Sequence, residues 1–173
     1  MSTNWRISSF NGVLLAAYFI PTWAIIAWRI ATEPVRGLFE RPSVSVALYA
    51  SDHLQLASTT TVRFAWLLAL GRLTVVAFFA LFLVLTVRSF IRKQGSGNEA
   101  LVIALGIGSV ISFASMIMAS QVGEAEALRL HATELLLMLG TAIVMVFDLP
   151  VQPRAATVPS DLPLEQAELS YNS

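Results

Sequence analysis

The chain has 173 residues, of which 56% are hydrophobic and 13% are charged, and its formal net charge is zero. Soluble domains carry about a quarter charged residues, so this composition, with a mean hydropathy of +0.71, is typical of integral membrane proteins. A neutral chain offers no electrostatic footprint for nucleic acid, and we expect no nucleic-acid partner. The absence of cysteine excludes disulfides, thiolate metal sites, cysteine nucleophiles and thiol-linked lipids.

Four apolar segments are each long enough to cross a bilayer as a helix, which takes about 20 residues. The first contains Pro21, which predicts a kink, and lacks the small-residue cleavage site of a signal peptide, so it is predicted to be an uncleaved span. The sequence therefore predicts an all-α, integral membrane four-helix bundle within residues 1–149. The predicted spans are 10–28, 64–87, 100–120 and 129–148.

The connections between the spans differ in length. Arg29 to Arg63 is long for a helix connection and contains Pro34 and Pro42, which predicts one short helix at the outer membrane surface. A tight turn around Gly123 joins the last two spans as an antiparallel hairpin. The prolines and acids of 150–173, without an apolar period, predict a disordered cytoplasmic tail.

Orientation is predicted from one short loop. Arginine and lysine residues divide evenly between the two sides, but Arg88, Arg92 and Lys93 crowd the loop between the second and third spans. The positive-inside rule has most force in short loops, so this loop and both termini are predicted to be cytoplasmic. The expected location is a bacterial plasma (inner) membrane, crossed several times.

Small residues recur every four positions along the third span, at Ala104, Gly108 and Ser112, and Ser115 and Ala119 extend a nearby stripe. In lipid, small residues permit the close backbone approach that holds helices together. The third span is therefore predicted to lie at the centre of the bundle.

The last span begins with charged residues. Its apolar part, Leu135 to Phe147, is too short to cross alone, so a helix ending near Asp148 must extend back to about Arg129. At 1.5 Å per residue, Glu134 then lies about 21 Å above Asp148.

A second charge falls at a similar depth. Arg72 lies about 24 Å from Arg88 along the second span, measured in the same way. An isolated charge at that depth costs at least about 2.5–3.5 kcal/mol on insertion scales. The matching depths predict a buried Arg72–Glu134 ion pair, with His131 on the same helix face as Glu134.

Further polar residues fall near this level and define a candidate pocket that opens outward. Ser112 and Ser115 belong to the third span, and Thr22 and Trp23 to the first; of these, Ser112, Ser115 and Thr22 are the candidate lining residues. Asp52 and His53 in the outer connection are candidates to cover the pocket.

Three interpretations of this cluster compete. It is a structural pair that fixes helix register, as a buried polar group can, or it binds or transports a small solute or a proton. A metal or haem site is the third: His131 and Glu134 have ligand spacing, and His53 lies on the same side. Because a metal needs three or four ligands, these three are only weak candidates, and we predict no metal and no cofactor.

The sequence favours a non-enzymatic function, since it contains no catalytic triad spacing and no phosphate-binding loop. The expected protein is an accessory, assembly or interaction subunit, in contact with the lipid bilayer and with a membrane-protein partner or further copies of itself. The alternative is a small-solute or proton transporter or sensor built on Arg72, His131 and Glu134.

Overall fold

A computed structural model describes residues 7–40, 43–55, 57–92 and 98–148. In these ranges all regular elements are α-helices, and four are long and apolar enough to cross a membrane. This confirms an all-helical chain with four long apolar helices. The predicted tail at 150–173 and Lys93 lie outside the described residues. The long helices are α1 (Ile7–Thr32), α4 (Ser58–Arg92), α5 (Asn98–Val122) and α6 (Ala125–Phe147).

Each long helix buries one stripe and exposes large apolar side chains elsewhere. In α1 the buried residues Phe19, Trp23 and Ala27 recur every four positions, so they share one face. Leu14 and Trp28 of the same helix are 54% and 70% exposed. The helix continues through Pro21.

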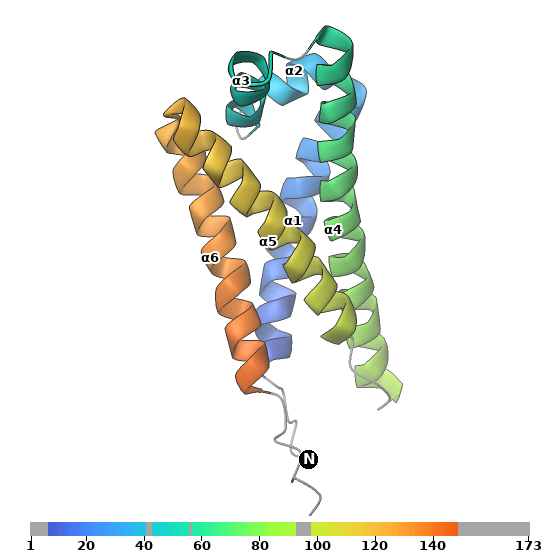
Figure 1. Cartoon of the computed structure of the whole chain (residues 1–173). Coiled ribbons are helices and arrows are strands. Elements are labelled where there is room, and N and C mark those ends of the chain that lie inside the picture. Colours follow the sequence, from blue (N-terminus) through green and yellow to red (C-terminus); the bar gives the residue numbers. More distant parts are fainter. Residues whose placement is uncertain (1–6, 41–42, 56, 93–97, 149–173) are drawn as a thin grey trace, which may run out of the picture.

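The long helices pack α1 against α4 and α6, and α5 against α4 and α6 (Figure 1). Their contacts meet in one apolar cluster, where Phe19 of α1 stacks on Phe79 of α4 at 5.7 Å between ring centroids. Met138 of α6 is fully buried in the same cluster. The cluster contains residues of all four long helices and so helps to fix their relative positions.

The small residues of α5 form the predicted packing stripe. All five positions from Ala104 to Ala119 that the spacing singled out are buried. A Cβ atom at Gly108 would lie 2.7 Å from the sulfur of Met138, so a larger residue there would displace the Met138 side chain from its place between α5 and α6. Gly123 then reverses the chain between them with φ of +79°, and the Glu124 amide donates to the Ala119 carbonyl.

The connection between α1 and α4 contains two short helices, where the sequence predicted one. They are α2 (Pro34–Phe39) and α3 (Val44–Asp52). Glu33 precedes a proline and leaves the helical region (φ −132°, ψ 77°), because the proline ring clashes with a helical preceding residue. Pro34 then starts α2, in the position where its missing N–H costs nothing.

Helix α3 covers the end of the long helices, as Figure 1 shows. Its Val46 and Ala47 are buried with Ala27 of α1 and Ala65 of α4 in a second apolar cluster. We call this the α3 end. α3 packs against the long helices because its small and apolar residues face them. A place for it at the outer membrane surface stays a prediction.

The opposite end is joined by a polar contact. The Ser8 hydroxyl and amide, at the start of α1, both donate to Asp148 Oδ2, at 2.5 and 3.2 Å. A carboxylate at a helix N-terminus accepts from amides without helical partners and faces the positive end of the helix dipole. We call this the Ser8–Asp148 end.

Gly37→Ala should destabilise the protein, because the added Cβ would lie 2.8 Å from backbone atoms of Arg29 and Ile30, which cannot move aside. Overpacking of this kind costs about 1–3 kcal/mol. Gly106→Ala is the matched control, since its Cβ would meet no atom within 4 Å. Thermal unfolding in detergent should show a lower Tm for the first variant alone; equal Tm values would contradict the close α1–α2 contact.

Candidate functional site

The carboxylate of Glu134 is the centre of a buried hydrogen-bond network. Glu134 is 3% exposed and accepts from three different helices. Trp23 Nε1 of α1 donates to Oε1 at 3.0 Å, and Ser112 Oγ of α5 donates to Oε2 at 3.3 Å. His131 of the same helix α6 places Nδ1 3.0 Å from Oε2 and donates when that nitrogen carries the proton.

These bonds explain how a carboxylate is tolerated in an apolar interior. A hydrogen bond to a charged group contributes about 1.5–3 kcal/mol, whereas an unpaired buried charge costs several kcal/mol. Because the donors come from α1, α5 and α6, the carboxylate also ties these helices together. The network therefore fixes their relative height.

Arg72 of α4 joins the network through its contact with the Trp23 ring. Its side chain is 2% exposed, and Nη1 donates to Ser43 Oγ at 3.0 Å. Its guanidinium carbon lies 5.8 Å from the centroid of the Trp23 ring, within cation–π range. The residues joined in this way are called the polar cluster: Trp23, Ser43, Arg72, Ser112, His131 and Glu134.

The predicted direct Arg72–Glu134 ion pair is not formed among the described residues. Trp23 contacts both groups. The guanidinium of Arg72 lies over its ring, and its indole nitrogen donates a hydrogen bond to the carboxylate of Glu134. The two charges still attract each other electrostatically. Depth along two helices predicted that they share a level, but it carried no information on the side chain that contacts both.

Other candidates occupy different places. Ser115 is buried on α5, one turn beyond Ser112. Thr22 does not join the polar cluster; its hydroxyl donates to the Tyr18 carbonyl within α1. Asp52 and His53 are exposed, and His53 stacks on Tyr49 at 4.8 Å rather than covering the cluster.

Two members of the cluster were not among the sequence candidates. Trp23 was noted only for its depth, although a buried indole N–H needs an acceptor and Glu134 was the available one. Ser43 had no comparable signal, because its position depends on how α3 folds back over the long helices. The part of the chain that the structure describes contains no group of three His, Asp or Glu side chains placed to hold a metal.

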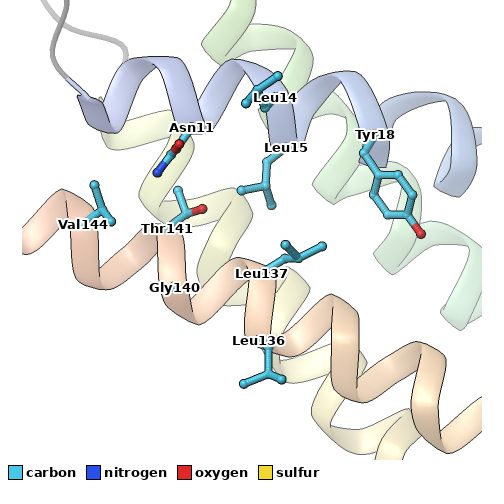
Figure 2. Close-up of a pocket in the computed structure, with 9 residues that line it drawn as sticks. All are labelled: Asn11, Leu14, Leu15, Tyr18, Leu136, Leu137, Gly140, Thr141 and Val144. Carbon is cyan, nitrogen blue, oxygen red and sulfur yellow. The ribbon is translucent and has the colours of Figure 1, made fainter.

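An apolar groove of about 410 Å³ lies between α1 and α6, on the Ser8–Asp148 side of the polar cluster. Figure 2 shows Asn11 and Thr141 facing each other across it, with Leu15 and Leu137 projecting into its middle. Tyr18 also lines this groove. None of the cluster residues lines this groove.

Comparison with protein-family models, with curated proteins and with solved structures gives no match to this chain.

A double-mutant cycle at Arg72 and Glu134 should show strong coupling. Arg72→Met or Glu134→Leu alone leaves an opposite charge buried without its counterpart, which costs about 3–5 kcal/mol. The double variant buries neither charge. Its loss of unfolding free energy should therefore be smaller than the sum of the two single-variant losses by about 0.5–3 kcal/mol. Denaturant titration in detergent gives the four values, and strict additivity would show that the charges do not interact.

Trp23→Phe separates the hydrogen bond from the ring packing. Phenylalanine keeps an aromatic ring beside Phe19, which contacts Trp23 edge to face, but removes a donor from Glu134. The expected loss is about 1–3 kcal/mol of unfolding free energy. Trp66→Phe, at a 53% exposed position, serves as the control and should change stability by less than about 0.5 kcal/mol. Similar losses in the two variants would show that the Trp23–Glu134 hydrogen bond does not stabilise the fold.

Proposed function

We propose that this chain is a multi-pass integral protein of a bacterial plasma membrane and acts there as a non-enzymatic accessory or assembly subunit. Its four long helices would cross the bilayer, with the Ser8–Asp148 end in the cytoplasm and the α3 end outside. Its task would be interaction with a membrane-protein partner or with further copies of itself.

The distribution of apolar surface supports membrane insertion. Large apolar side chains are exposed on every long helix, including Leu14, Leu67, Val110 and Leu136, at 54%, 66%, 69% and 70%. In water such surface costs about 25 cal/mol per Å². In lipid it costs nothing, while charges and hydrogen-bonding groups must turn inward, as the polar cluster does.

The closed polar cluster is the observation that favours a non-enzymatic role. An active site exposes reactive groups to a substrate, whereas here Glu134 and His131 are 3% and 2% exposed and bonded to each other. The apolar groove beside them offers mainly leucine and valine side chains. These features suit a register device that holds the helices for docking, and they give a polar substrate no entry.

A transporter or sensor is the second candidate, favoured by the His131–Glu134 hydrogen bond. Protonation of either group would change the charge inside an apolar core, where such changes have large effects. In that case Glu134→Gln would preserve the fold and abolish a pH-dependent ion flux in liposomes. If Glu134→Gln instead lowers the stability of the fold, and neither the natural chain nor any variant shows an ion flux, the accessory role is favoured.

The proposed topology is tested with single cysteines, since the natural chain has none. Ser51→Cys lies on the exposed side of α3, and Asn98→Cys at the opposite end of the fold, where α5 begins. A membrane-impermeant maleimide should label the first in intact spheroplasts and the second only after permeabilisation. The reverse pattern would invert the proposed orientation, and labelling of both in intact spheroplasts would contradict membrane insertion.

The accessory role predicts a stable partner. Purification from native membranes in a mild detergent, followed by mass spectrometry, should recover one membrane protein in constant proportion to this chain. Arg72→Met should lower that yield if the cluster shapes the docking surface, whereas Glu33→Gln, at an exposed site, should leave it unchanged. Repeated recovery of the chain alone and monomeric would overturn the proposal.

A further inference from the structure

Two polar side chains face each other across the apolar groove between α1 and α6 (Figure 2). Asn11 and Thr141 line this groove together with leucine and valine side chains of both helices. Thr141 is only 4% exposed, yet within the described residues neither its hydroxyl nor the Asn11 amide group makes a hydrogen bond. A buried polar group without a partner costs about 1–3 kcal/mol, and in the bilayer core no water is present to supply one.

The Thr141 hydroxyl differs from those of other threonines in the long helices. The hydroxyls of Thr22, Thr74 and Thr133 each donate to the carbonyl four residues earlier in their own helix. Such a bond is the usual way to satisfy a threonine in an apolar helix. Thr141 does not form it and instead points toward Asn11, so its hydroxyl is available to a molecule in the groove.

The groove is kept open by Gly140 and can be entered from the side. A Cβ atom at Gly140 would meet nothing within 4 Å, so the glycine leaves free space among the lining residues. Leu14 and Leu136, which also line the groove, are 54% and 70% exposed. In a chain that spans a membrane such surfaces face lipid, so a ligand reaches the groove from the bilayer and not from water.

The depth of the two polar groups matches that of lipid ester carbonyls. At 1.5 Å per residue, Asn11 lies about 5 Å along α1 from Ser8, and Thr141 lies about 10 Å along α6 from Asp148. The charge of Asp148 places the Ser8–Asp148 end at the level of the headgroups. The headgroup region adds about 5–8 Å to each side of a hydrocarbon core about 30 Å thick. Asn11 and Thr141 therefore lie near the boundary between headgroups and acyl chains.

We propose that the groove binds one acyl chain of a diacyl glycerophospholipid, whose ester carbonyl accepts hydrogen bonds from Asn11 and Thr141. An ester carbonyl only accepts, and the amide and the hydroxyl can both donate. The acyl chain then lies against Leu15 and Leu137 and extends toward Tyr18.

The size and charge of the groove favour this occupant. A helix is about 10–12 Å in diameter, so a volume of about 410 Å³ holds only about one turn of a partner helix, whereas a single acyl chain is much narrower. None of the described residues that line the groove is charged, so the polar contact is made to the ester and not to the phosphate. The proposal rests on the membrane insertion proposed above and not on the accessory role.

Native mass spectrometry of the full chain in a mild detergent, titrated with lipid, tests the proposal. The two probes are a diester phosphatidylglycerol and its diether analogue, which has the same chains and headgroup but no carbonyl oxygen. The diester should bind about 25-fold more tightly, the equivalent of two hydrogen bonds of about 1 kcal/mol each. Equal affinity for the two lipids, or no binding of either, would overturn the proposal. A failure of membrane insertion would appear separately, in the cysteine labelling.

Variants locate the bound lipid. Gly140→Leu should fill the groove and abolish binding, whereas Gly106→Leu, on α5 outside the groove and equally free of close neighbours, should bind as the natural chain does. Thr141→Val should lower the preference for the diester about fivefold, the equivalent of one hydrogen bond. Thr74→Val, whose hydroxyl is bonded within its own helix, should leave that preference within twofold. If Gly140→Leu does not fold, Thr141→Val decides. Equal binding by the two glycine variants, or an unchanged ester preference in Thr141→Val, would contradict the assignment.

Discussion

The hydrogen bond from the Trp23 indole to the Glu134 carboxylate is the contact on which the rest of the structure depends. It satisfies a charge that an apolar interior would otherwise reject, and it joins the first long helix to the last. The same ring faces Arg72, so one side chain links three helices. Ser112 and Ser43 then bring α5 and α3 to the same point. Apolar packing alone can slide along a helix, whereas these bonds specify one register.

Length, apolar content and the position of charges predicted much of this fold. The four apolar segments became four helices, and the small residues of α5 became its buried face. The depths of Glu134 and Arg72, counted along their helices, predicted that the two lie at one level, and both belong to the polar cluster. Helical rise is uniform, so distances along a helix are predictable from residue numbers.

What the sequence did not predict depends on tertiary geometry. Two charges at one depth can be contacted by different side chains, depending on how each helix is rotated about its axis. The sequence does not give that rotation, so it did not predict that Trp23 contacts both charges. Ser43 entered the cluster only because α3 folds over the long helices, while Asp52 and His53, nearby in sequence, turn outward. Thr22 shares the depth of Trp23 but bonds to its own helix, since a threonine hydroxyl readily reaches the carbonyl one turn earlier.

The central claim is that an ionised Glu134 accepts from Trp23 within a closed interior. Proton–nitrogen NMR correlation of ¹⁵N-tryptophan-labelled protein tests it most directly, with the Trp23 signal assigned by Trp23→Phe. The account predicts one indole proton shifted downfield from the other three, which moves back when Glu134→Gln removes the charge. An indole signal from Trp23 that resembles those of Trp28 and Trp66 and ignores Glu134→Gln would contradict it.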